Sequence, residues 1–331
     1  MPDNISLITA DTLGRLSSSD FEEEALKVFQ YQHRNNALYR QFCDALHVNA
    51  DNVKNVSSIP FLPVSFFKTH TIKTGDWDKA ALIFESSGTT KDTPAKHYVK
   101  DETIYEVSLL NGFKEFYGNP ADYAILALLP SYLERGNASL VHMAKVLIEQ
   151  SGHADNGFYI NEWQQLHDVI ERLEAQGQKI LLLGVTFALL DFAEAYPMTL
   201  QHTVVMETGG MKGRREEMTR AEAHAYLKQQ WQLNEVHSEY GMTELLSQAY
   251  AVKDGIFKPT STMQVFVRDI NDPLDVSTSG TGCLNIVDLA NVYSCSFIAT
   301  DDIGTIAEDG TFEVLGRVDH SALRGCNLMV I

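Results

Sequence analysis

The chain has 331 residues, 44% of them hydrophobic, and carries 44 acidic against 26 basic side chains, for a net charge of −18. This length exceeds one typical hydrophobic core, so we expect a large α/β unit with a smaller β-rich portion. The acidic balance argues against a nucleic-acid partner or stable membrane insertion, since no basic face and no apolar run of about 18 residues is visible. With no secretion signal and four widely spaced cysteines that suit reduced thiols, we expect a cytoplasmic protein.

Helical and strand-like patterns alternate along the chain. A helix is expected over residues 20–45. Strands follow at 81–85, 122–129, 179–184, 202–207 and 234–238, and helices at 100–117, 137–150, 161–176, 185–195 and 213–231. This alternation predicts βαβ crossovers and a largely parallel sheet.

From residue 263 onward the pattern changes to short strands separated by turn residues. These strands are expected at 263–268, 282–288, 293–299, 304–308 and 311–315. We therefore divide the chain into an N-terminal helical segment that packs on the core (1–79), an α/β core (80–262) and a β-rich subdomain (263–331).

A hydroxyl-rich glycine loop follows the first strand, which is apolar and expected to be buried. It reads Glu85-Ser86-Ser87-Gly88-Thr89-Thr90-Lys91. A glycine without a Cβ lets the backbone turn sharply and present N–H groups to an anion, and the hydroxyls add donors. The spacing matches neither the Walker nor the Rossmann loop. Taken alone, a phosphate-binding loop and a solvated turn are equally good interpretations.

Three more motifs carry groups suited to nucleotide chemistry. Tyr240-Gly241-Met242-Thr243-Glu244 follows a predicted strand, where ligands bind in open α/β sheets and a carboxylate can hold Mg²⁺. Thr300-Asp301-Asp302 places an aspartate on a predicted tight turn, and Gly316-Arg317-Val318-Asp319 adds a cation near the last strand. Two of them also have a plainer interpretation, namely a helix N-cap for Glu244 and a hairpin turn for Asp302. The Gly-Arg-x-Asp pattern is weak by itself.

Together and in this order, the four motifs resemble the core motifs of the adenylate-forming superfamily, which includes acyl-CoA synthetases, beetle luciferase and peptide-synthetase adenylation domains. Residues 84–90 and 316–329 are further similar to the LuxE-type acyl-protein synthetases. This resemblance implies the superfamily's large N-terminal domain, with parallel sheets flanked by helices plus a β-rich subdomain. It also implies that the superfamily's C-terminal domain, which carries a catalytic lysine, is largely absent.

The resemblance implies ATP and Mg²⁺ as cofactors, a fatty acid as substrate and a reductase-like protein as partner. Residues 80–262 would then bind nucleotide and acid, and 263–331 would end in a hinge and an acyl-acceptor segment. The resemblance further implies that the β- and γ-phosphates are held by Ser86, Ser87, Gly88, Thr89 and Thr90, with Lys91 and Lys96 adding positive potential. Thr243 would contact the α-phosphate, Glu244 would ligate Mg²⁺, and Asp302 and Arg317 would bind the ribose. The adenine would be bordered by Gly209, Gly210, Tyr240 and Gly241, and Cys326 would accept the acyl group.

This chain departs from the superfamily pattern at three positions. Lys91 replaces a common glycine, Lys96 is displaced by one residue from the usual post-proline lysine, and Asp301 replaces a glycine. Two alternatives therefore stay open beside the acyl-protein synthetase. One is an acyl- or aryl-CoA ligase of the phenylacetate-CoA ligase type, and the other is a nucleotide-binding regulatory module without catalysis.

Overall fold

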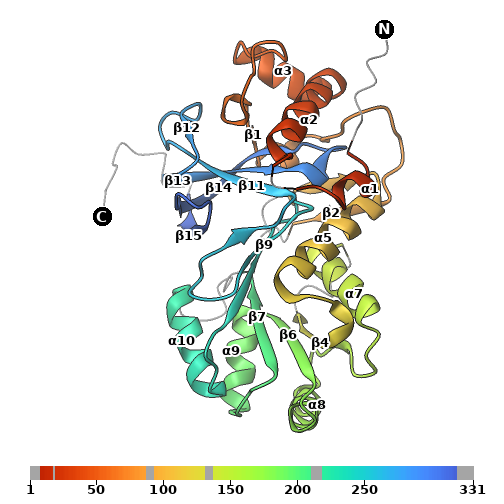
Figure 1. Ribbon diagram of the computed structural model, residues 1–331, viewed down its shortest axis with the longest axis vertical. Helices are drawn as coiled ribbons and strands as arrows, with labels where there is room; N and C mark the ends of the chain where they lie inside the picture. The colour runs from red at the N-terminus through yellow and green to blue at the C-terminus, as the bar shows by residue number, and fades with distance from the viewer. Residues whose placement is uncertain (1–7, 18, 87–92, 131–136, 210–217, 319–331) are drawn as a thin grey trace.

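The protein is described from a computed structural model, which places residues 8–17, 19–86, 93–130, 137–209 and 218–318 (Figure 1). The helices are α1 (Ala10–Leu13), α2 (Phe21–Asn35), α3 (Ala37–Ala45), α4 (Phe66–Thr69), α5 (Glu102–Tyr117), α7 (Ser139–Ser151), α8 (Trp163–Ala175), α9 (Thr186–Ala195) and α10 (Arg220–Trp231). Short 3₁₀ turns are η1 (Val56–Ser58), η2 (Pro120–Asp122) and η3 (Leu289–Asn291).

A seven-stranded sheet forms the lower half of the molecule in Figure 1. Its order is β10 (Lys258–Pro259), β9 (Ala249–Ala251), β8 (His237–Tyr240), β7 (Thr203–Thr208), β6 (Lys179–Val185), β4 (Tyr123–Leu128) and β5 (Gly157–Phe158). The five strands from β8 to β5 run parallel, and β9 and β10 are antiparallel. Helices α9 and α10 lie on one side of this sheet and α5 and α7 on the other (Figure 1). The predicted parallel sheet is therefore confirmed, and the complete burial of β4 follows from its cover on both faces.

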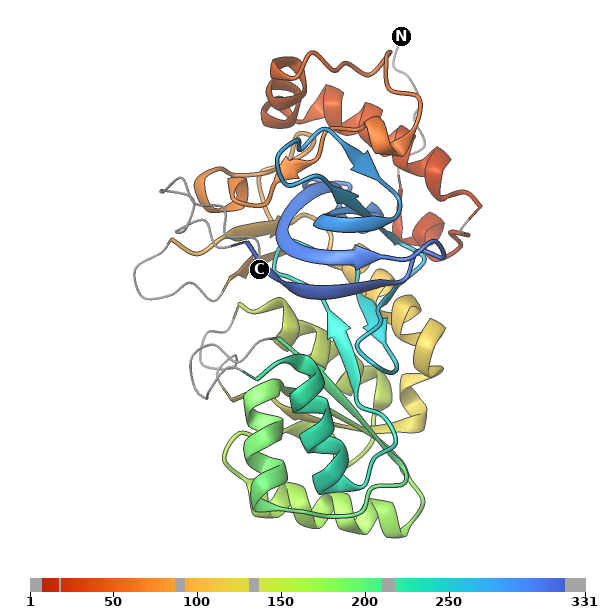
Figure 2. The same cartoon turned by 90° about the vertical axis from the view of Figure 1, so that its left-hand side faces the viewer.

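A six-stranded sheet lies above it. Its order is β1 (Leu62–Pro63), β14 (Phe297–Ile306), β13 (Gly280–Asp288), β11 (Met263–Arg268) and β12 (Val276–Ser277), with β15 (Phe312–Arg317) also on β14. Strand β1 comes from the N-terminal segment and runs parallel to β14. Figure 2 shows the N-terminal helices above this sheet. Their aromatic rings meet those of β14, where Tyr39 stacks on Phe297 with ring centroids 6.1 Å apart.

The hairpin of β2 (Leu82–Glu85) and β3 (Lys96–Val99) departs from the expected pattern. The strand at 81–85 was expected to be buried and to belong to the parallel sheet. Instead it pairs antiparallel with β3 in a separate two-stranded sheet, where Ile83 is exposed. A short apolar run does not distinguish a buried strand from a strand covered on one face.

Three other element boundaries were wrong. The helix expected over 20–45 breaks at Asn36, because this side chain caps the next helix by accepting from the Tyr39 N–H. In the helix expected over 213–231, residues 213–217 lie outside the described residues, and α10 begins at Arg220, since Thr219 and Glu222 form a capping box. The strands expected at 293–299 and 304–308 are one continuous strand, β14, so Asp302 lies within a strand and not on a tight turn.

Candidate active site

The described motif residues gather where the two large sheets meet. Tyr240 ends β8, and Thr243 and Glu244 lie in the turn that follows it. Asp302 on β14 and Arg317 on β15 are direct cross-strand partners. The tertiary fold thus joins residues that are 62 positions apart in sequence, since the Tyr240 hydroxyl donates to Asp302.

Asp302 is held by two donors. The Tyr240 hydroxyl donates to Oδ2 at 2.7 Å, and Arg317 Nε donates to Oδ1 at 3.0 Å. Asp302 is 6% exposed, whereas the Arg317 side chain remains 66% exposed. Burial and the adjacent Asp302 carboxylate raise the pKa of Tyr240, so the phenol stays protonated and donating. Each carboxylate oxygen keeps a second lone pair that can accept from a ligand hydroxyl.

Glu244 is a buried carboxyl at the same junction, with an exposed fraction of 7%. Burial raises its pKa to about 7, although the charges of Arg317 and Lys68 act in the opposite direction. The segment after Glu244 is an irregular connection to β9, so the alternative of a helix N-cap is excluded. A carboxylate oxygen is the ligand type that Mg²⁺ prefers, and a bound cation would favour the ionised form of this buried group.

The β2–β3 hairpin carries Glu85 and Ser86, the two described residues of the glycine loop. Ser86 closes the hairpin, because its hydroxyl accepts from the Ala95 N–H at 2.8 Å. Lys96 Nζ lies 3.1 Å from Glu85 Oε1, so this lysine is ion-paired within the hairpin. Ser87, Gly88, Thr89, Thr90 and Lys91 lie outside the described residues, as do Gly210 and Cys326.

Gly209 follows β7, on the strand next to β8. Its φ of +74° is in the left-handed region that favours glycine. Its carbonyl accepts from the Thr186 hydroxyl at 2.6 Å, and the same hydroxyl donates to the buried Glu207. At Gly241, a Cβ would run into the Glu239 carboxylate. The backbone conformation thus favours glycine at position 209, and the neighbouring Glu239 side chain favours it at position 241.

The sequence patterns missed three contributors to the site. Lys68 lies on α4 in the N-terminal segment and contributes positive potential at Glu244. His97 on β3 contacts the Thr243 carbonyl, and Asn291 on η3 donates to the Glu244 carbonyl. No motif marks these residues, because all three reach the site through tertiary contacts.

The tyrosine, the carboxylates and the arginine thus meet near the carboxyl ends of parallel strands, which is where the open α/β class of folds binds its ligands. Within that class, the family model described as "Acyl-protein synthetase, LuxE" matches residues 17–331. The chain belongs to this family, whose members are ligases. The predictions of the family, the fold class and a ligase are therefore confirmed.

Relatives of known activity match over most of their length. The chain is 25% identical to the long-chain-fatty-acid–luciferin-component ligase of Vibrio harveyi, covering 91% of this chain and 84% of that one. It is 22% identical to the ligase of the same name from Aliivibrio fischeri, with 91% and 85% covered. Together with the fold, these relatives support activation of an acid by this chain.

Solved structures confirm the fold. ATP-bound MatB from Rhodopseudomonas palustris superimposes with a TM-score of 0.53 at 17% identity, covering 74% of this chain and 50% of that one. O-succinylbenzoate coenzyme A synthetase from Bacillus subtilis, in complex with ATP and magnesium ion, gives 0.52 at 17% identity, covering 73% and 51%. The chain thus spans about half the length of these two proteins. Among its described residues, no helix has the length and apolar character needed to cross a membrane.

Proposed function

We propose that this protein uses ATP and Mg²⁺ to convert a fatty acid to an acyl-adenylate and then transfers the acyl group to the thiol of Cys326. The observation that carries this proposal is the convergence of Glu244 with the Asp302–Arg317 pair at one junction. The names of the relatives from Vibrio harveyi and Aliivibrio fischeri support a fatty acid as the substrate. A reductase that collects the acyl group and a cytoplasmic location complete the proposal.

In the first half-reaction, a carboxylate oxygen of the fatty acid attacks the α-phosphorus of ATP. The bond from this phosphorus to the bridging oxygen of the β-phosphate breaks, and pyrophosphate leaves. Asp302, fixed by Tyr240 and Arg317, would accept hydrogen bonds from the ribose hydroxyls and so orient the nucleotide. Such alignment supplies much of the rate enhancement of a transfer between two bound reactants.

Charge at the phosphates is the second requirement. Glu244 would hold Mg²⁺, which neutralises developing phosphate charge when bound. Thr243 would contact the α-phosphate, and the loop that includes Ser86 would hold the β- and γ-phosphates. Lys96 would add positive potential after exchanging its ion pair with Glu85 for a phosphate.

In the second half-reaction, the Cys326 thiolate attacks the acyl carbon of the mixed anhydride. The bond from this carbon to the AMP oxygen breaks, AMP leaves and a thioester remains. The thiolate is the reactive form of cysteine, so the thiol proton must pass to water or to a neighbouring base. Transfer of the acyl group to a reductase would follow by the same type of exchange.

Labelling with radioactive fatty acids tests the proposal. The protein is incubated with ATP, Mg²⁺ and fatty acids of several chain lengths, and the products are separated on denaturing gels. We expect label on the wild type and on a Cys283→Ala control, and none on Cys326→Ala. All three proteins should catalyse acid-dependent pyrophosphate exchange. Label that persists on Cys326→Ala would overturn the assignment of the acceptor.

The same incubation, repeated with coenzyme A added, distinguishes the two alternative functions. A soluble coenzyme A thioester without labelled protein would identify a coenzyme A ligase, which the solved acyl-coenzyme A synthetase fold supports. ATP binding without pyrophosphate exchange for any acid would identify a regulatory nucleotide-binding module.

A further inference from the structure

The turn that carries Glu244 is held from the six-stranded sheet. Asp288, at the end of β13, accepts from the backbone N–H groups of Leu246 at 2.7 Å and Ser247 at 3.1 Å. The Ser247 hydroxyl donates to the same carboxylate at 2.6 Å. Asp288 is fully buried, so water does not compete for these bonds. The chain that leaves Glu244 is therefore tied to a rigid strand end.

Asn291 holds the turn at Glu244 itself. Its amide Nδ2 donates to the Glu244 carbonyl at 2.8 Å and to Asp288 Oδ2 at 3.2 Å. Asn291 is 1% exposed and lies on the short turn η3, directly after Asp288. The two side chains thus form one hydrogen-bonded unit beneath the turn.

His97, on β3, holds the preceding residue, Thr243. Its Nδ1 lies 2.9 Å from the Thr243 carbonyl oxygen, which can only accept, so Nδ1 carries the proton. Burial lowers the pKa of His97 to about 4, which keeps the ring neutral and leaves Nε2 as an acceptor. The ring is fixed edge-on against Phe67, with centroids 5.7 Å apart.

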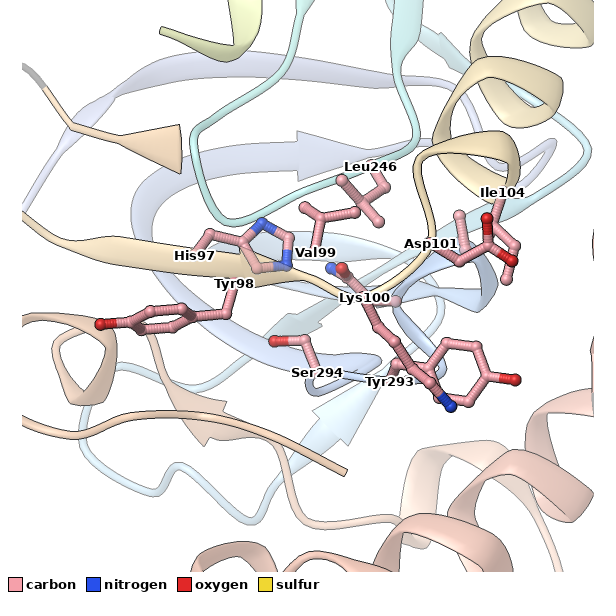
Figure 3. A pocket seen from close by; sticks show the side chains of 11 residues that line it. His97, Tyr98, Val99, Lys100, Asp101, Ile104, Leu246, Tyr293 and Ser294 are labelled. Carbon is pink, nitrogen blue, oxygen red and sulfur yellow. The ribbon is translucent and has the colours of Figure 1, made fainter. Parts of the chain in front are cut away.

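A small cavity lies beside His97, between residues that include Lys100, Leu246 and Ser294 (Figure 3). Among the described residues, His97 Nε2 and Asn291 Oδ1 have no hydrogen-bond partner, and both residues line this cavity. The space open to the centre of a water molecule is about 10 Å³, which is enough for one water and too small for a fatty acid.

We propose that His97, Asp288 and Asn291 are positioning residues that fix the Thr243–Glu244 turn. His97 has a second consequence, because it lies on β3 and so ties the turn to the hairpin that carries the glycine loop. The Thr243–Glu244 turn and the β2–β3 hairpin are then held in one frame, although the hairpin is a sheet separate from the one that ends in this turn. This inference rests on the proposed function, since it assigns the turn and the loop to the same nucleotide.

Kinetics of pyrophosphate exchange test this inference with matched variants. His97→Leu removes the donor to the Thr243 carbonyl, whereas His97→Asn keeps an amide donor near the position of Nδ1. Because a displacement of about 1 Å can lower a rate by about 10²-fold, we expect His97→Leu to lose activity on this scale. The Mg²⁺ concentration for half-maximal rate should rise, and His97→Asn should recover most of both losses. His202→Leu should leave both parameters unchanged, because His202 is exposed and precedes the first residue of β7, at the opposite end of the parallel strands.

Two results would overturn the positioning role. One is a His97→Leu variant with a rate and Mg²⁺ dependence within twofold of the wild type. The other is a His97→Asn variant no better than His97→Leu. If His97→Leu does not fold, His97→Gln replaces it, because its amide reaches toward the Nε2 position and not toward Thr243.

A measurement that does not depend on activity separates this inference from the proposed function. Nitrogen NMR of the His97 ring should show a proton on Nδ1 and none on Nε2 between pH 5 and about 8, well above its lowered pKa. The opposite tautomer would refute the contact with Thr243 even in an active enzyme. A wild type without exchange activity but with the expected tautomer would refute the proposed function and leave the contact established.

Discussion

Replacement of Glu244 by glutamine should stabilise the ligand-free protein and impair its activity. The pKa of Glu244 is raised from 4.5 to about 7, chiefly by burial. Each pKa unit corresponds to about 1.4 kcal/mol, so ionised Glu244 lowers the free energy of unfolding by about 3 kcal/mol above pH 7. Glu244→Gln has nearly the same shape and no charge, so it removes this cost.

The sign of the pH dependence follows from proton binding. Between pH 4.5 and about 7, Glu244 holds its proton in the folded protein and loses it in the unfolded chain. The folded state then binds more protons, so the contribution of this group to stability falls as the pH rises through this window. Above pH 7 both states are ionised and the contribution no longer changes.

Urea unfolding at pH 5 and pH 8 measures the effect. Other buried carboxyls also titrate, so the informative quantity is the difference between wild type and variant at each pH. We expect Glu244→Gln to gain about 2.5 kcal/mol more at pH 8 than at pH 5, and an exposed control, Glu308→Gln, to show no such difference. A Glu244→Gln variant that is less stable than the wild type at pH 8 would refute the reasoning. So would a difference that does not depend on pH.

Two further predictions concern Tyr240, which donates to Asp302, and Gly304, which lies on the same strand as Asp302. Tyr240→Phe removes the donor to Asp302 Oδ2, so it should lower the free energy of unfolding by about 1.5–3 kcal/mol. It should also raise the KM for ATP. A loss of stability under about 0.5 kcal/mol in urea unfolding would contradict this prediction. A Cβ at Gly304 would overlap the Glu313 backbone carbonyl, so Gly304→Ala should lower the free energy of unfolding by about 1–3 kcal/mol. Gly316 has open space around it, so Gly316→Ala should leave the stability unchanged. Equal melting temperatures for the two variants would contradict this prediction.

Local sequence patterns predicted the elements that have a long period or a clear boundary. The parallel sheet from β4 to β8 follows from the alternation of apolar runs with amphipathic helices. The motif around Glu244 was correctly placed after a strand. These features could be predicted because each depends on residues close together in sequence. The cross-strand pairing of Asp302 with Arg317 was not predicted, since Asp302 was expected on a tight turn.

Features that depend on distant pairing could not be predicted. Strand β2 pairs with β3 and not with the parallel sheet. Its four residues are too few for their pattern of apolar side chains to indicate which strand it pairs with. His97, Asp288 and Asn291 lie in ordinary strand and turn contexts, so only the tertiary fold brings them to Glu244. The same holds for Lys68, which approaches the site from the N-terminal segment.

The pairing of β1 with β14 also determines when this protein can fold during its synthesis. Gln32 on α2 donates to the Asn291 carbonyl, 259 residues later in the chain, and β1 has its parallel partner only in β14. At a synthesis rate of about 5–20 residues per second, the N-terminal helices wait roughly 10–50 s for their partner strands. During this interval Phe29 and Tyr39, both fully buried in the finished protein, have no completed core to enter. Until β14 has been made, the apolar side chains of the N-terminal segment therefore lack the partners that bury them in the finished protein.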